Sequence, residues 1–343
     1  MIDVLPEIYE DELFYSWLAR CYVRNCYPDY KMFSHQVMGR RDTNPNFEFI
    51  NAITDNERPQ IIKHFGGSIS NILNNHTLIP YYSCFIDDNK RKFVYERAST
   101  ENLSFDKLLS LPNLQKPKYL QYCPECVNED RRKKGEAYWR RIHQINIIKV
   151  CPVHKCHLCV SDVQTNGKIK GDMQPAETAI KDVGKIITGN NREIELAKYI
   201  KEILDNSCYR PQITTMSAGR VLSIKMQETK YVSRRGNKRK VSMLHQDLVD
   251  YWGEELMMPL YEMKKVLRGI NFQTSLIVLL AIYLKVPAPD LVMRNIKEGT
   301  RIEEFDNRVI ELYKSGKSIS SIAYTMKLSQ LTINHILEKG CLN

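Results

Sequence analysis

Four side chains in this sequence have the types and spacing needed to bind a metal ion. Cys123 and Cys126 form one pair and Cys151 and His154 form another, each with two residues between the ligands and a proline first in the turn. A tight turn of this length directs two side chains at one ion, and two such turns complete a tetrahedron. Three thiolates and one imidazole form a closed ligand set, without a position for water or substrate. The pattern therefore predicts one structural Zn²⁺ and no catalytic metal.

Other potential ligands lie close to the second pair. Cys156, His157 and Cys159 follow it, and His143 lies between the two pairs. Replacement of His154 by Cys156 in the ligand set, or a second metal, is an alternative, and so is a set of buried thiols beside an unrelated histidine. The sequence begins with no basic, apolar leader, and in a reducing compartment clustered cysteines are metal ligands more often than disulfides.

The elements around the predicted metal site read as short helices. Asp11 suits the N-cap of a first amphipathic helix with Trp17 on its apolar face, and helical periodicity returns at Ile194–Leu204 and Asp247–Leu284. We expect a mainly α, multi-domain helical protein with helix-turn-helix units and one small zinc-finger module. The predicted domains are residues 1–118, helical and helix-turn-helix-like; 119–165, a Cys3His zinc finger; 166–298, helical with a basic loop; and 299–343, a C-terminal helix-turn-helix.

The C-terminal segment has the pattern of a DNA-binding helix-turn-helix. Apolar residues from Ile319 to Met326 give one helix face, Ser329 is placed as the N-cap of the next helix, and Ile333 to Leu337 pack that helix back. Small polar side chains at the start of a recognition helix suit base edges in the major groove. The predicted base-contacting set is Ser329, Gln330, Thr332, Asn334 and His335. The alternative is a helical hairpin packed on the rest of the protein.

Basic residues form a second set of predicted nucleic-acid contacts. The chain carries 50 Lys+Arg against 40 Asp+Glu, a net charge of +10, and such a field favours polyanions. Residues 230–240 hold six positive charges and no acid, which predicts phosphate contacts, although such a run is often only a solvated loop. The predicted contacts are Arg234, Arg235, Lys238, Arg239 and Lys240, together with Arg140 and Arg141. The neighbouring Trp139 is expected to pack around the zinc instead.

Several classes of protein lack support in the sequence. There is no phosphate-binding glycine loop, no dinucleotide fingerprint, no nucleophile elbow and no apolar run long enough for a membrane span. We therefore expect a cytoplasmic, non-enzymatic protein without membrane contact. A hydrolase or nuclease with a scattered catalytic set is a third-rank alternative.

Three blocks of residues around the zinc pattern resemble the TniQ/TnsD family of transposon target-selection proteins, and the TnsD branch most closely. They are Tyr122–Val127, Gly135–His143 and Cys151–His154. The N-terminal region carries further matching residues: Pro6, Tyr9, Glu12, Leu13, Ser16, Arg20, residues 39–41 and residues 76–82. The chain departs from many relatives in lacking a further Cys-x-x-Cys pair after the first finger, so a second zinc ribbon is not expected.

The resemblance implies a function and partners. A protein of this family would bind a specific double-stranded DNA attachment site, near the bacterial nucleoid, and recruit the AAA+ ATPase regulator that brings the transposase. By analogy, the N-terminal helical region would bind that regulator. Within the family the alternative is an adaptor that links a CRISPR effector complex to the transposition machinery. Outside it, the alternative is a zinc-containing transcription regulator.

Overall fold

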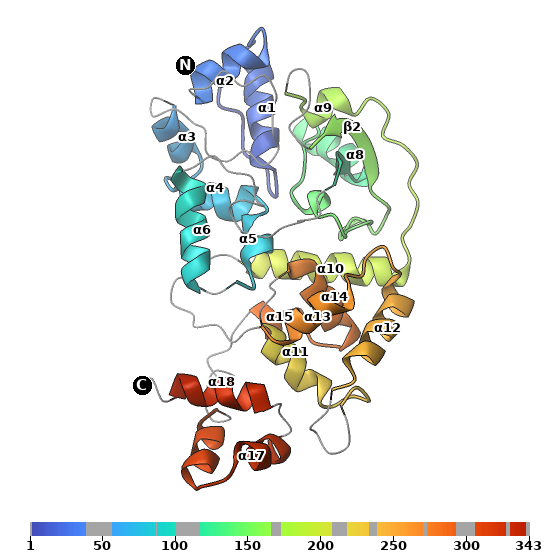
Figure 1. Cartoon of the computed structure of the whole chain (residues 1–343). Coiled ribbons are helices and arrows are strands. Elements are labelled where there is room, and N and C mark those ends of the chain that lie inside the picture. The colour runs from blue at the N-terminus through green and yellow to red at the C-terminus, as the bar shows by residue number, and fades with distance from the viewer. Residues whose placement is uncertain are drawn as a thin grey trace. The chain divides into compact units, whose positions relative to one another are not determined.

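The computed structural model describes residues 2–38, 57–86, 88–100, 117–165, 173–207, 218–232, 239–269, 273–292, 306–326 and 330–340. The chain forms two compact units, Met1–Pro211 and Gln212–Asn343. The described residues are mainly helical, which confirms the predicted fold class (Figure 1).

The first unit begins with a set of short helices. They are α1 (Phe14–Arg24), α2 (Tyr30–Met38), α3 (Arg58–His64), α4 (Ile69–His76), α5 (Ile79–Ser83) and α6 (Asp88–Thr100). Trp17 on α1 is fully buried, and its ring lies 4.9 Å from that of Phe65, which follows α3. This aromatic contact holds α1 in the core of the unit, as the apolar face of the sequence predicts.

Asp11 does not cap the first helix, so that prediction is wrong. The N-cap is Leu13, without a side-chain capping bond, and Asp11 has a positive φ of 57°. The carboxylate of Asp11 instead accepts hydrogen bonds from Nε of Arg141 (3.0 Å) and from the backbone N–H of Ile142 (3.1 Å). A contact with a distant segment has taken the place of the local cap.

A compact metal module, residues 117–165, follows these helices. It contains β1 (Tyr119–Tyr122), α8 (Pro124–Lys134), a 3-10 turn (Ile142–Gln144) and β2 (Cys159–Gln164). The strands pair antiparallel, with Tyr122 opposite Cys159. α8 begins directly after β1, so the first ligand pair lies where the strand ends and the helix starts.

Residues 173–207 complete the first unit. α9 (Ala176–Ala179) packs against β2, and α10 (Asn191–Asn206) packs against α5. A capping box between Asn190 and Glu193 begins α10, as helix-start chemistry requires. The predicted domain 166–298 is therefore divided between the two units, because these packing contacts hold its first part to the first unit.

The second unit contains α11 (Ala218–Met226), α12 (Val241–Trp252), α13 (Leu260–Leu267), α14 (Thr274–Tyr283) and α15 (Ala288–Val292). Helix α14 is buried on all sides from Leu276 to Ile282, which explains its continuous apolar sequence. Among the described helices none combines the length and apolar character that crossing a bilayer requires.

The C-terminal part of the second unit is a small three-helix assembly, here called the three-helix unit. A helix over residues 306–314 precedes α17 (Ile319–Thr325) and α18 (Gln330–Gly340). Its core is formed by Val309, Ile322, Ala323, Ile333, Ile336 and Leu337. The helices and their apolar faces match the predicted helix-turn-helix pattern, while the turn at residues 327–329, with Ser329, lies outside the described residues.

Candidate metal centre

The structure brings the four predicted ligands together. Nδ1 of His154 lies 3.5 Å from Sγ of Cys123, 3.2 Å from Sγ of Cys126 and 3.7 Å from Sγ of Cys151. The Sγ atoms of Cys126 and Cys151 are 3.8 Å apart, and all four atoms lie within 4.8 Å of one another. The three cysteines are buried, so the cluster is a closed group that can hold one metal ion.

These separations suit a tetrahedral metal site. With Zn–S near 2.3 Å and Zn–N near 2.0 Å, a tetrahedron places two sulfurs about 3.8 Å apart and a sulfur and a nitrogen about 3.5 Å apart. The observed distances scatter around these values. A divalent cation placed among these four ligand atoms would bond to all of them at once and so stabilise their close grouping.

Each ligand pair is held by its own turn. The backbone N–H of Cys126 points to Sγ of Cys123 at 3.4 Å, and that of His154 points to Sγ of Cys151 at 3.5 Å. Lys155, with φ of 60°, reverses the chain after the second pair, and its N–H donates to the carbonyl of Cys151 at 2.8 Å. In the folded chain, each turn therefore directs its two ligand side chains towards the same point.

The alternative ligands lie around the cluster. Sγ of Cys156 is 3.4 Å from Sγ of Cys123, and Nε2 of His143 is 4.0 Å from Sγ of Cys126, but neither belongs to the four-atom group. Burial raises the pKa of the Cys159 thiol, whose Sγ lies 3.9 Å from the carbonyl of Val183. The described geometry favours the predicted set over the swap to Cys156.

A carboxylate behind the histidine was missed by the sequence reasoning. Oε2 of Glu129 on α8 lies 3.3 Å from Nε2 of His154. When Nδ1 binds a metal ion, Nε2 carries the proton, and a carboxylate in this position orients the ring and makes it a better ligand. The position of Glu129, three residues after Cys126 on a helix that starts at the first ligand pair, is a signal that could have identified it.

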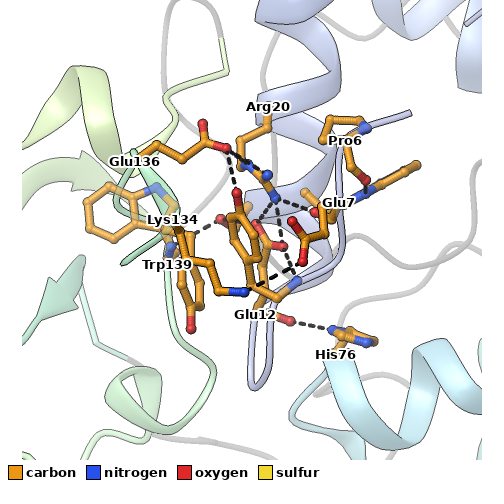
Figure 2. Close-up of polar contacts among 12 residues, drawn as sticks. Pro6, Glu7, Glu12, Arg20, His76, Lys134, Glu136 and Trp139 are labelled. Carbon is orange, nitrogen blue, oxygen red and sulfur yellow. Dashed lines mark hydrogen bonds and ion pairs between the residues drawn. The ribbon is translucent and has the colours of Figure 1, made fainter. Parts of the chain in front are cut away.

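A buried polar cluster joins the metal module to α1 (Figure 2). Arg20, 2% exposed, donates from Nη1 to Oε2 of Glu12 at 2.9 Å and from Nη2 to Oε1 of Glu136 at 2.7 Å. Glu12 also accepts from the hydroxyl of Ser16 at 2.9 Å. We call Glu12, Arg20 and Glu136 the junction cluster, because Glu136 comes from the metal module and the other two come from the N-terminal region.

Backbone groups extend this contact. The N–H of Leu13 donates to the carbonyl of Trp139 at 2.9 Å, and the N–H of Trp139 donates to the hydroxyl of Ser16 at 3.0 Å. Nδ1 of His76 lies 2.7 Å from the carbonyl of Glu12 (Figure 2). The Trp139 side chain is fully buried; its ring lies 6.5 Å from that of Tyr122, and its indole N–H donates to the carbonyl of Gln174 at 2.8 Å.

Burial alters the acid–base behaviour of the junction. It raises the pKa of Glu12 to about 7, against the lowering effects of Arg20 and Ser16. It also lowers the pKa of His76 to about 4. At physiological pH, His76 is therefore neutral in the folded protein.

Arg140 and Arg141, predicted to contact DNA, are used inside the first unit. Nη2 of Arg140 lies 2.5 Å from Oδ1 of Asp130, with the guanidinium over the ring of Tyr138. Arg141 is 7% exposed; its Nη1 donates to the carbonyls of Asn74 and Thr77. We therefore correct the prediction for Arg141: a guanidinium buried against carbonyls and Asp11 is not presented to a phosphate.

The remaining predicted DNA contacts belong to the second unit. Lys240, Gln330 and Asn334 are exposed, and Nε2 of Gln330 lies 2.8 Å from Oγ of Ser320. Arg239 is partly buried, with Nη1 donating to Oγ of Ser223 at 3.2 Å. Arg234, Arg235, Lys238 and Ser329, and the side chains of Thr332 and His335, lie outside the described part of the chain.

Comparison with known proteins identifies the region that carries the metal cluster and its junction with α1. Residues 4–158 match the TniQ family. A stretch of 158 residues is 25% identical to the Escherichia coli protein named transposon Tn7 transposition protein TnsD, covering 43% of this chain and 30% of that protein. The match thus spans less than a third of the relative's length. Residues 4–158 contain all four metal-binding candidates and the whole junction cluster, so the similarity to the TniQ family falls on the part of the chain that carries both.

Proposed function

We propose that this protein selects target DNA for a bacterial transposon. It would bind a specific duplex sequence through its second unit and recruit the AAA+ ATPase regulator of the transposase. The observation that carries the proposal is the joining, in one chain, of a TniQ region to a three-helix unit of helix-turn-helix pattern. The name of the Escherichia coli relative, a transposition protein, supports the transposon role.

The distribution of polar side chains supports DNA reading by the three-helix unit. Its described buried residues are all apolar, so its core does not contain the polar side chains that could contact DNA. Gln330 and Asn334 are exposed on α18, four residues apart and hence on one face of the helix. Amide side chains at the start of such a helix can bond bidentately to adenine in the major groove.

Zn²⁺ is our proposal for the ion held by Cys123, Cys126, Cys151 and His154. The metal would stabilise the fold of the module, because a Cys3His set leaves no open coordination position. Since the module is bonded to α1 through the junction cluster, the metal would also keep the N-terminal region in its folded arrangement. By analogy with the family, that region is the proposed binding site for the regulator.

The test is an unbiased selection of bound duplexes from random and genomic DNA by the metal-loaded chain at near-physiological salt. We expect one enriched sequence, and we expect the regulator of the same transposon to co-purify on that duplex only when the chain is present. Binding that is blind to sequence and vanishes with salt would overturn direct target selection and favour the CRISPR-linked adaptor. Binding to one sequence without any regulator would favour a transcription regulator.

A further inference from the structure

A cavity of about 540 Å³ in the first unit leads to the metal cluster. Its lining combines exposed residues, among them Glu10, Asn75 and Val153, with two buried metal ligands, Cys126 and Cys151. The cavity has room for several molecules of the size of water, each of which occupies about 30 Å³ in the liquid. A reagent as small as water can therefore reach these two sulfurs from the surface, although both cysteines are buried.

The two cysteines that line the cavity are close enough to be joined by a bond. Their Sγ atoms lie 3.8 Å apart. Because a disulfide brings its two sulfurs to about 2 Å, each Sγ needs to move by only about 1 Å. Cys126 belongs to the first ligand pair and Cys151 to the second, so a bond between them would take one metal ligand from each turn.

A second pair of sulfurs separates proximity from access. Sγ of Cys156 lies 3.4 Å from Sγ of Cys123, closer than the two sulfurs at the cavity. In the described structure neither Cys123 nor Cys156 lines the cavity, and the two residues are 0% and 2% exposed. Proximity alone therefore favours a bond between Cys123 and Cys156, whereas access by a small reagent favours Cys126 and Cys151.

We propose that Cys126 and Cys151 form an oxidation site, at which hydrogen peroxide converts the two metal-bound thiolates into a disulfide. The inference rests on the proposed metal site, since a bound metal ion keeps these thiols deprotonated and therefore nucleophilic. One thiolate attacks the peroxide; the O–O bond breaks, a sulfenic acid forms and hydroxide leaves. The second thiolate attacks the sulfenic sulfur, the S–O bond breaks and a second hydroxide leaves. Two protons from the solvent convert both hydroxides to water, so the peroxide is reduced and the two sulfurs are oxidised.

Oxidation at this site acts on the contact between the metal module and the N-terminal region. The disulfide removes two of the four ligands, and Cys123 and His154 alone do not complete a metal site. The cavity is also lined by Asp11, whose carboxylate accepts from Nε of Arg141 at 3.0 Å. Loss of the metal therefore loosens the module where it bonds to the N-terminal region, and a thiol reductant together with fresh metal restores it.

The test treats the metal-loaded full chain with hydrogen peroxide. Release of metal to a chromogenic chelator is followed in time, free thiols are then blocked, and the disulfides are mapped by mass spectrometry. We expect a disulfide between Cys126 and Cys151 for each metal ion released, and recovery of metal binding after a thiol reductant is added. Cys156→Ser keeps all four ligands, and we expect it to release metal at the unaltered rate.

A matched pair of variants tests the cavity as the route of the peroxide. Asn75→Trp adds bulk at an exposed position of the lining and should slow metal release several-fold. Asn89→Trp makes the same change at an exposed position of α6 outside the lining and should leave the rate unaltered. Equal rates for the two variants would overturn the cavity as the route.

Disulfide mapping separates the two pairs of sulfurs. A disulfide between Cys123 and Cys156, or metal release slowed by Cys156→Ser, would overturn the assignment, because proximity rather than access would then select the pair. A chain that keeps its metal under peroxide would overturn the oxidation site while leaving the proposed metal site intact. A full chain that binds no metal would overturn the metal site and this inference together.

Discussion

The first unit and the three-helix unit use their polar residues in opposite ways. Around the metal module, charged side chains are buried in the fold, as Arg20 and Arg141 show with 2% and 7% exposure. In the three-helix unit the described buried residues are all apolar, and Gln330 and Asn334 lie at the surface. A basic or polar residue in the sequence therefore indicates ligand binding only where the fold does not need that residue for its own buried contacts.

The largest expected effect follows from removing the metal. We predict that Cys126→Ser loses the ion and unfolds the first unit, because the apparent binding free energy of a structural zinc, about 10–16 kcal/mol, is as large as the stability of a typical domain. Metal analysis and regional hydrogen exchange would check this: amides of the first unit should lose protection while those of α17 and α18 keep it.

Cys159→Ser is the matched control, since Sγ of Cys159 lies outside the four-atom group. It should retain the metal and the protection of the first unit. A Cys126→Ser protein that stays folded without metal and binds DNA normally would contradict the structural role of the ion. Equal loss of amide protection in both units would show that the second unit also depends on the metal for its fold.

The junction cluster gives the next largest effect. Arg20→Met leaves Glu12 buried without its cation, and breaking a buried ion pair in this way costs about 3–5 kcal/mol. Arg24→Met removes a second arginine from the same carboxylate of Glu136, but Arg24 is 42% exposed, so its loss should cost less than about 1 kcal/mol. Urea unfolding of the metal-loaded protein would measure both. Similar decreases in the free energy of unfolding for the two variants would show that burial does not determine how much each arginine contributes to stability.

A pH effect of intermediate size is expected from His76. Burial lowers its pKa from 6.5 to about 4, so the folded state binds fewer protons than the unfolded state between these values. The stability that neutral His76 contributes is fully present above pH 6.5 and is lost as the pH falls towards 4, by up to about 3 kcal/mol.

The measurement is the free energy of unfolding against pH for the unaltered chain and for His76→Gln. Acid also weakens metal binding, but it does so in both proteins, so the difference between the two curves isolates the histidine. We expect the His76→Gln curve to be flatter over this window. Parallel curves would mean that His76 is protonated without cost in the fold.

The smallest expected effect concerns the three-helix unit. Replacing Gln330 and Asn334 with alanine should change stability by less than about 0.5 kcal/mol, because both side chains are exposed. It should reduce discrimination between the selected duplex and random DNA by about 1–3 kcal/mol for each base-reading side chain removed. Competition binding with the two duplexes would check this. An equal decrease in affinity for both would argue against base reading by these residues.

The sequence by itself determined the local features of this protein. The two ligand pairs, the fully apolar α14 and the helices of the three-helix unit follow from spacing and periodicity within a few residues, and all are present as predicted. The fold class could be predicted for the same reason, since helical periodicity is a property of short segments.

Only the tertiary structure decided how distant segments use their polar groups. Asp11 has the residue type of an N-cap but accepts from Arg141 and Ile142, and Arg141 has the charge of a phosphate contact but is buried. Burial and partner choice are set by segments more than a hundred residues apart, as in the contact of Arg20 with Glu136. Residue type fixes what a side chain can bond, whereas packing fixes which partner it meets and whether water can compete for the bond.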